Sequence, residues 1–270
     1  MSKSRFFKGL VVLSGILLIM SLLPASASAS GTIKLNPGAT LTVGSADVSG
    51  RGGSCQLPKL NCKGASAVST SSKIIRAKTR ATLSGKGSYW AKVGGRFFVS
   101  QGDSGQTYGQ ARITISRISY NGTVGALGIA AGKAILRMYV SGGPQKDILV
   151  AAGSGAAAQS FQNSNVSTSV EMEVKSGQTY DVYLEIVAAA GSGSMISPAD
   201  VNFYDGGKQA TYQNIRVDIL SAGAPVNVGN PGNGQVFFYD NYQCVTNNPN
   251  GAWSLSGDWW DNSISSFRIE

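Results

Sequence analysis

The sequence predicts an all-β protein built around a two-sheet antiparallel β-sandwich of jelly-roll type. Three observations favour this fold class. Apolar and polar residues alternate with a period of two in many short segments, a pattern typical of strands with one buried and one solvated face. Glycine-rich turns separate these segments. No stretch carries apolar residues at helical spacing over several turns, so we expect no long helix.

Residues 1–29 have the features of a secretory signal peptide. Basic residues in the first eight positions precede an apolar run over 10–23, and small residues in an Ala-x-Ala pattern predict cleavage after Ala27 or Ala29. No later apolar stretch is long enough to span a bilayer. We therefore expect a secreted protein whose mature chain has no transmembrane segment.

The segment 30–72 is rich in Gly, Ser and Thr. Short strands are expected at 32–35 and 40–43. Cys55 and Cys62 enclose a short loop, and in an exported protein we expect them to form a disulfide. The small and polar residues from 65 to 72 predict an exposed connector to the following domain.

Residues 73–222 are expected to form the sandwich. Alternation is clear over 166–175 and 180–186, and the turn Lys175–Gln178 between these segments predicts a tight hairpin. Further strands are expected near 73–83, 88–99, 112–116, 134–140, 147–151 and 214–219. A domain of this size is large enough to bury its own core.

The composition limits the chemistry of this chain. Histidine is absent, which removes the usual general base at neutral pH, the histidine-dependent nucleophiles and nearly every zinc site. Removing the three basic residues of positions 1–30 lowers the formal net charge from +9 to +6, and mild basicity of this kind suits acidic cell-wall polymers but also simply favours solubility. Since the basic residues are scattered and no nucleic-acid motif accompanies them, nucleic-acid binding is not expected.

The acidic residues of the predicted sandwich do not indicate an active site. Glu171 and Glu173 lie on one predicted strand, and Asp181 and Glu185 on another. In each strand the opposite face is apolar, which predicts that these acids point into solvent. Because a glycosidase pair from distant strands would be invisible in the sequence, an undetected polysaccharide hydrolase stays open as an alternative to a protein that is not an enzyme.

A carbohydrate-binding module is another alternative. It would be favoured by aromatic side chains on one exposed sheet face, and Tyr139 and Tyr183 are the candidates at outward strand positions. Two similar Ala/Gly/Ser loops, at 150–156 and 187–194, either form part of a binding rim or reflect low-complexity composition.

The last dozen residues place oxygen-bearing side chains in a short turn. Asp261 and Asn262 precede Ser265 by a few positions, and hard oxygen ligands of this kind suit calcium rather than a transition metal. The plainer interpretation is a polar turn before a last strand. Upstream, the segment Val236–Tyr242 combines a strand pattern with an aromatic corner ending in Asp240.

Together, residues 226–270 resemble a single βγ-crystallin-type Greek key motif with its calcium signature. The resemblance implies a calcium site with Asp240, Asp261, Asn262 and Ser265 as ligands. Because such motifs normally act in pairs, it also implies that the sandwich, water or a second chain completes the site, so that the protein can dimerise through this motif. The family's second aromatic and its glycine are replaced here by Cys244 and Thr246.

The sequence therefore predicts a secreted calcium-binding β-protein with a structural or extracellular binding and adhesion role. The expected partner is a cell-wall polymer, a glycan or an extracellular protein. Since microbial proteins with the terminal fold include metalloprotease inhibitors and killer-toxin-like proteins, the resemblance also leaves open an extracellular protease inhibitor or an antimicrobial toxin.

Overall fold

A computed structural model of the chain describes residues 31–56, 61–192, 198–223, 236–240, 243–248 and 264–269. The predicted signal peptide lies outside these residues. The chain divides into two compact units, residues 1–224 and 225–270, which we describe separately. None of the described residues forms a helix long and apolar enough to cross a membrane.

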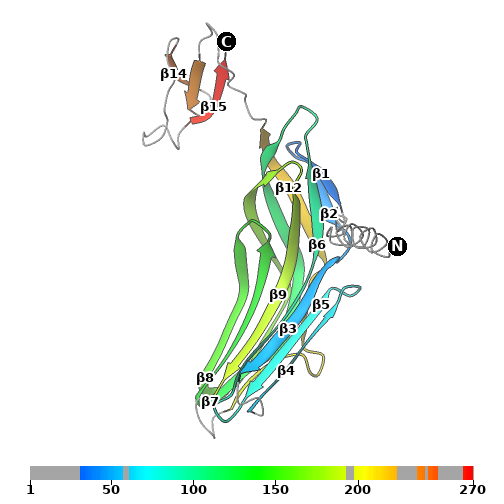
Figure 1. The fold of residues 1–270 in the computed structure, drawn as a ribbon, viewed down its shortest axis with the longest axis vertical. Helices are drawn as coiled ribbons and strands as arrows, with labels where there is room; N and C mark the ends of the chain where they lie inside the picture. Colours follow the sequence, from blue (N-terminus) through cyan, green and yellow to red (C-terminus); the bar gives the residue numbers. More distant parts are fainter. Residues whose placement is uncertain are drawn as a thin grey trace, which may run out of the picture. The chain divides into compact units, whose positions relative to one another are not determined.

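The described residues of the first unit form strands joined by turns and include no helix (Figure 1). The strands are β1 (Thr32–Lys34), β2 (Thr40–Val43), β3 (Val48–Gln56), β4 (Cys62–Ser69), β5 (Ile74–Ala81), β6 (Lys86–Ser100), β7 (Tyr108–Val140), β8 (Gln145–Lys175), β9 (Thr179–Gly191), β10 (Ala199–Phe203), β11 (Gln209–Thr211) and β12 (Asn214–Gly223). The all-β sandwich predicted from the alternation is confirmed.

Hydrogen bonds join these strands into one sheet that folds into two layers. In the first, the β9 layer, β3, β6, β9 and residues 131–140 of β7 lie side by side. In the second, the β5 layer, β4 and β5 continue through β10 and β11 to residues 108–126 of β7. β2 and β12 extend the second layer, and β1 pairs in parallel with β6, which makes the sheet mixed.

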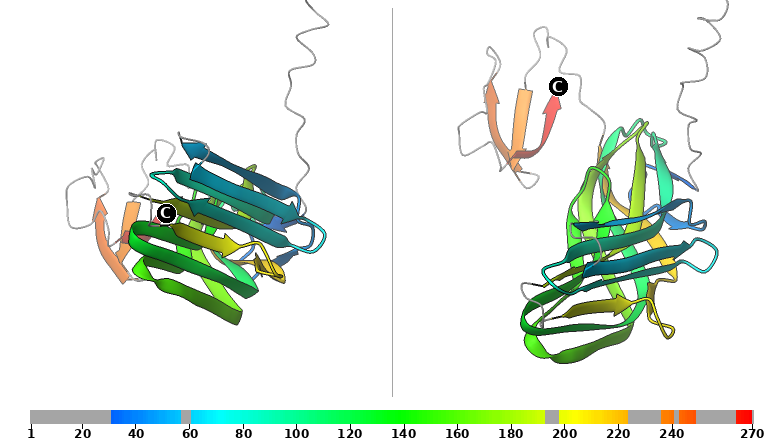
Figure 2. Two further views of the ribbon diagram at one scale, coloured as in Figure 1. Left: turned by 90° about the horizontal axis from the view of Figure 1, so that it is seen from below. Right: turned by 60° about the horizontal axis from the view of Figure 1, so that its bottom comes forward.

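The two longest strands connect the layers. β7 and β8 pair along nearly their whole length, from Tyr108 opposite Lys175 to Tyr139 opposite Gln145. This ribbon bends near residues 127–130 and passes from the β5 layer into the β9 layer, as Figure 2 shows. Strands were expected at 112–116, 134–140 and 147–151, and all of these residues are in strands. The expected separation is wrong where 112–116 and 134–140 belong to one strand, β7, and where 147–151 continues to Lys175 in β8. Among the described strands, β8 pairs with β7 alone, so it forms the edge of both layers.

The predicted hairpin at Lys175–Gln178 is also wrong. β8 enters this turn in the β5 layer and β9 leaves it in the β9 layer, and the two strands do not pair with each other. The turn instead bonds to the end of β6, where the Gly177 amide donates to the Val99 carbonyl at 2.8 Å. Turn residues specify a change of direction, whereas the partner of each strand depends on the whole fold.

The N-terminal strands are integrated into the same sheet. The predicted exposed connector at 65–72 is wrong, because β4 reaches Ser69 and pairs residue by residue with β5. The predicted disulfide between Cys55 and Cys62 is confirmed. It links β3 of the β9 layer to β4 of the β5 layer, and therefore ties the two layers together at the edge opposite β8.

The core lies between the layers. The predicted apolar faces are buried, with Val182, Leu184 and Ile186 of β9 fully enclosed. Phe97 stacks on Tyr180 with ring centroids 5.3 Å apart. Each fully buried side chain of this size contributes about 1.5–3 kcal/mol relative to exposure, so the core is the main source of stability.

The second unit contains a three-stranded antiparallel sheet among its described residues, in the order β14–β13–β15. Its strands are β13 (Val236–Asp240), β14 (Gln243–Asn248) and β15 (Ile264–Ile269). The register of β13 shifts on both sides next to Tyr239, which leaves Val245 of β14 and Ser265 of β15 unpaired. Both positions are therefore β-bulges.

Candidate functional site

The ribbon of β7 and β8 is irregular at one place in the β5 layer. Its register shifts between Ile115 and Ile118 and again between Ile118 and Tyr120. Two residues there, Arg117 with φ of 51° and Asn165 with φ of 64°, take the left-handed conformation that side-chain-bearing residues seldom adopt. Bulges of this kind bend a strand and redirect its side chains.

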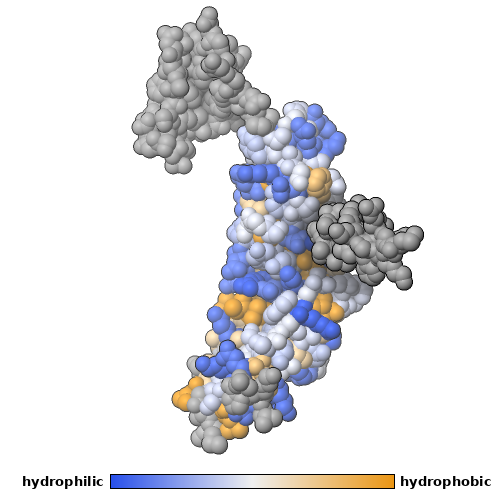
Figure 3. Space-filling view, in the orientation of Figure 1, coloured by the Kyte–Doolittle hydropathy of each residue, from blue (hydrophilic) through white to orange (hydrophobic). Residues whose placement is uncertain are grey.

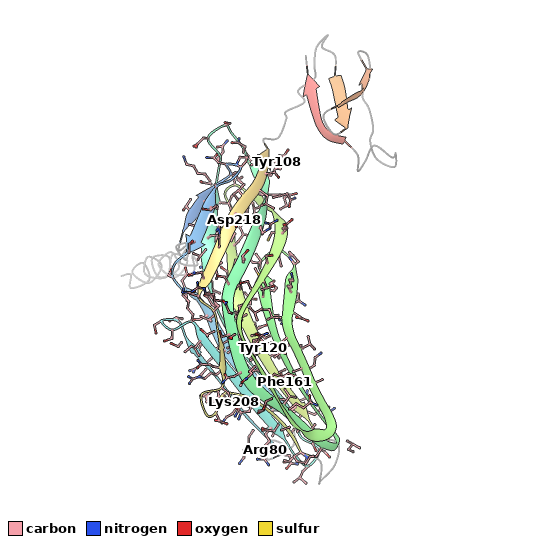
Figure 4. All side chains as sticks on the ribbon, turned by 180° about the vertical axis from the view of Figure 1, so that it is seen from behind. Arg80, Tyr108, Tyr120, Phe161, Lys208 and Asp218 are labelled. Atoms are coloured by element: carbon pink, nitrogen blue, oxygen red, sulfur yellow. A yellow bond between two sulfur atoms is a disulfide. The ribbon has the colours of Figure 1, made fainter. Side chains whose placement is uncertain are left out.

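A groove with a volume of about 570 Å³ opens beside this irregularity, and we call it the amide groove. Three segments far apart in the sequence supply its walls. The register sets Asn121 of β7 between Gln162 of β8 and Gln209 of β11. The lining residues are Ser119, Tyr120, Asn121, Gln162, Asn163, Ser164, Gly207, Gln209 and Thr211. Figure 4 views the molecule from the side that shows Tyr120.

Backbone and side-chain hydrogen bonds fix the amide groups of the groove. The Gln209 backbone amide donates to Asn121 Oδ1 at 2.9 Å, and the Ser164 amide donates to Asn163 Oδ1 at 2.8 Å. Arg76 Nη2 donates to Gln209 Oε1 at 2.8 Å. These bonds occupy carbonyl oxygens and leave NH₂ groups as donors. The exposed Gln162 side chain makes no hydrogen bond to another described residue.

The lining of the amide groove is polar but uncharged. Amides and hydroxyls can each donate and accept hydrogen bonds, whereas none of the nine lining residues is an acid or a base at neutral pH. Tyr120 is half-buried and adds aromatic surface that packs against the core. Such a lining can hold a neutral ligand rich in hydroxyl groups, and it supplies no general acid or base.

The tyrosines expected on an outward face lie on the outer face of the β9 layer. Tyr139 and Tyr183 stack on each other with ring centroids 4.9 Å apart, and Lys92 Nζ lies 4.4 Å from the Tyr183 centroid. Burial and the nearby Glu185 raise the pKa of Tyr183 to about 12. Because Tyr139 stacks on Tyr183 and Lys92 also lies over its ring, the Tyr183 ring is already engaged by neighbouring side chains and is a poor platform for a sugar.

Figure 3 looks onto the molecule from the side of Figure 1 and shows orange apolar patches separated by blue hydrophilic ones. The four acids singled out in the sequence each pair with a basic residue: Glu171 with Arg112 at 2.7 Å, Glu173 with Lys175 at 3.1 Å, Asp181 with Arg96 at 2.6 Å, and Glu185 with Arg137 Nε at 2.6 Å. Each of these carboxylates is therefore held by a neighbouring basic side chain.

The structure describes two of the four predicted calcium ligands, at the level of the backbone. Asp240 ends β13 and pairs with Ile264, and the unpaired Ser265 follows directly. These two positions therefore lie next to each other across the β13–β15 pair. Asp261 and Asn262 lie outside the described residues. No group of three or more His, Cys, Asp or Glu side chains suited to a metal occurs in the part of the chain that is described.

Comparison with known proteins adds no family to this picture. No family model matches the chain, and no significant match is found among curated proteins.

The sequence did not single out the amide groove, although a signal was present. The run from Gln159 to Asn165 is polar at almost every position, which breaks the alternation on either side of it. A polar run in a strand is also typical of an edge exposed on both faces, so this pattern alone cannot identify a groove.

Proposed function

We propose that this chain is an exported binding protein, without catalytic activity of its own, that holds a hydroxyl-rich stretch of an extracellular glycan in the amide groove. The observation that carries the proposal is the lining itself: four amide side chains, three hydroxyls and one tyrosine, with no charged group. Sugar hydroxyls both donate and accept hydrogen bonds, and amides match them without the desolvation cost of burying a charge.

The size of the groove supports the same ligand class. Its volume of about 570 Å³ lies within the range of small-molecule sites, which is about 300–1,000 Å³. Each hydrogen bond to a neutral group contributes about 0.5–1.5 kcal/mol net, so a few such bonds predict weak binding per sugar unit. Attachment to a polymer or a cell surface would then depend on several copies acting together.

Export is part of the proposal and rests on two observations. The first is the signal-peptide pattern in residues 1–29. The second is the Cys55–Cys62 disulfide, because disulfides persist in oxidising compartments and are rare in the cytosol.

A calcium site in the second unit completes the proposal. The bulge at Ser265 supports it, since bulges redirect side chains and this one adjoins Asp240. Calcium takes six to eight oxygen ligands, and a single motif supplies only part of them. We therefore expect a weak site of the extracellular type, with a dissociation constant on the order of 10⁻⁴ M or higher.

Replacing Gln162 with Ala tests the amide groove. Gln162 is exposed and makes no hydrogen bond to another described residue, so the change should leave the fold intact. The matched control is Gln110→Ala, because Gln110 is an exposed residue of β7 in the same layer but outside the groove.

The mature protein is first screened on an array of neutral and acidic glycans, and the affinity for the best ligand is then measured by calorimetry. We expect Gln162→Ala to weaken binding about fivefold, the equivalent of one hydrogen bond, and Gln110→Ala to have no effect. Equal affinities for both variants and the unchanged protein would refute the amide groove as the binding site.

A further inference from the structure

A row of basic side chains lies on the outer face of the β5 layer. Along β5, buried residues alternate with Arg76, Lys78 and Arg80, whose side chains point away from the core. Successive members of this row are two residues apart, which corresponds to about 7 Å along a strand. The spacing produces a line of positive charge rather than a single cationic spot.

Neighbouring strands strengthen this row. Lys63 of β4 lies directly opposite Arg80, and Lys208 lies just before β11. Two acids share the face: Asp205, which bonds to Lys78 at 2.7 Å, and Asp200, which pairs with Arg80 in register. Five cations therefore face two carboxylates. We call the five residues the basic row: Lys63, Arg76, Lys78, Arg80 and Lys208.

The Lys63–Arg80 pair is the informative part of the basic row. Like charges directly opposite each other on neighbouring strands destabilise a sheet. Both side chains are exposed, and neither makes a hydrogen bond or a salt bridge with another described residue. Neighbouring Asp200 lies on the other side of Arg80. Burial raises the pKa of the Asp200 carboxyl, whereas the charge of Arg80 acts to lower it, so Asp200 offsets part of the positive charge. An anionic ligand would relieve the repulsion between Lys63 and Arg80.

The basic row begins at the wall of the amide groove. Arg76 donates through Nη2 to Gln209 Oε1, and Gln209 lines the groove. Gln209 in turn pairs with Asn121 in the middle of the lining. Figure 4, which shows the molecule from behind, labels Arg80 and Lys208 together with Tyr120. One extended ligand can thus contact the groove and the basic row together.

We propose that the ligand of this protein is an acidic polysaccharide, with a hydroxyl-rich stretch in the amide groove and its carboxylate or phosphate groups along the basic row. This inference rests on the proposed glycan-binding function and adds the charge of the ligand to it. Arginine binds both carboxylate and phosphate through two parallel hydrogen bonds, so Arg80 suits either anion.

A nucleic acid is the competing polyanion, and the described surface fits it less well. Binding of single strands relies on aromatic rings that stack with bases. Next to the basic row, the Tyr204 ring is covered by Lys78, whose Nζ lies 5.0 Å from its centroid. Tyr120 is half-buried against the core. The neutral amides of the groove favour sugar hydroxyls.

The test compares two variants of the mature protein with the same loss of charge. Lys63→Gln with Arg80→Gln removes two cations of the basic row. Lys86→Gln with Lys133→Gln removes two exposed cations from the β9 layer and serves as the control. Thermal unfolding checks that both variants fold.

Three polymers serve as probes at low and at high salt: a polyuronate, the same polymer with its carboxylates reduced to alcohols, and a sugar-phosphate polymer. Single-stranded DNA is measured beside them as the competing polyanion. At low salt we expect the polyuronate, the phosphate polymer or both to bind about tenfold more tightly than the reduced polymer. At high salt this preference for the charged polymer should become smaller, because salt screens the charges. The Lys63/Arg80 variant should lose about tenfold in affinity for the anionic polymer, as two exposed charge pairs of about 0.7 kcal/mol predict. The control should lose far less.

Each part of the argument can fail separately. In one outcome, the charged and the reduced polymers bind equally well, with an affinity that falls in Gln162→Ala but not in the Lys63/Arg80 variant. That result would refute the acidic ligand and would still support binding in the amide groove. Binding that depends on the basic row but not on Gln162 would refute the groove. Two results would refute the assignment to a polysaccharide. The first is tighter binding of single-stranded DNA than of either anionic polymer, with the same dependence on Lys63 and Arg80. The second is the absence of binding to all three polymers.

Discussion

Gly122 lies against the ring of Phe203, and its replacement by Ala measures how closely the β5 layer is packed. A methyl group added at Gly122 would lie 2.3 Å from Cδ1 and Cε1 of Phe203 and 2.4 Å from Cγ. Ordinary van der Waals contacts begin near 3.4 Å, so the ring or the strand would have to move by about 1 Å. Phe203 is fully buried, so its ring can move only if its neighbours in the core move too.

Overpacking of this kind costs typically about 1–3 kcal/mol. For a folded unit of this size, 1 kcal/mol lowers the melting temperature by about 2–4 °C, so Gly122→Ala should lower it by about 2–12 °C. The control is Gly153→Ala, because its added methyl group would meet the nearest atom at 3.4 Å and should change stability by less than about 0.5 kcal/mol.

The assay is thermal and urea unfolding of the mature protein and both variants. Phe203→Leu in the Gly122→Ala background should recover part of the loss, because the smaller side chain makes room for the methyl group and the two changes couple. An unchanged melting temperature for Gly122→Ala, or strictly additive losses in the double variant, would refute the close contact between Gly122 and Phe203. Asn121 adjoins Gly122, so a displaced strand should also weaken glycan binding.

Three further changes test other features. Replacing Cys55 and Cys62 by Ser should cost about 2.4 kcal/mol, the loop-closure value for a sequence separation of 7, and should make unfolding insensitive to reductant. Asp200→Asn should stabilise the protein at pH 7 and leave its stability unchanged near pH 3. Burial raises the pKa of the Asp200 carboxyl in the folded state, so the wild-type protein loses stability as the pH rises and this carboxyl ionises. Ser265→Ala should abolish a calcium-dependent rise in melting temperature and barely alter the calcium-free value.

The outcomes that contradict these expectations are equally specific. If the disulfide-free variant were as stable as the oxidised wild type, the covalent link between the layers would contribute nothing to the free energy of unfolding. Equal pH profiles for Asp200→Asn and the wild type would show that burial does not perturb the Asp200 carboxyl. A calcium response that survives in Ser265→Ala, or is absent from the wild type, would remove Ser265 from the site.

The strand pattern could be read from the sequence because it is local. Val182, Leu184 and Ile186 alternate with polar neighbours, and that alternation already predicts which side of β9 faces a core. The Cys55–Cys62 bridge was also predictable, since the two cysteines are close in sequence and export favours a disulfide. A pattern of this kind says that a strand exists and which face is buried, but not which strand lies beside it.

Tertiary structure alone decided the pairing and the candidate site. The turn Lys175–Gln178 joins two layers instead of two neighbours, because hydrogen bonds to distant strands determine the partners of β8 and β9. The amide groove brings Asn121, Gln162 and Gln209 together from three segments, and the basic row meets it through Arg76. Contacts between residues so far apart in the chain leave no local periodicity in the sequence, since they arise only when the β7–β8 ribbon bends and the sheet folds onto itself.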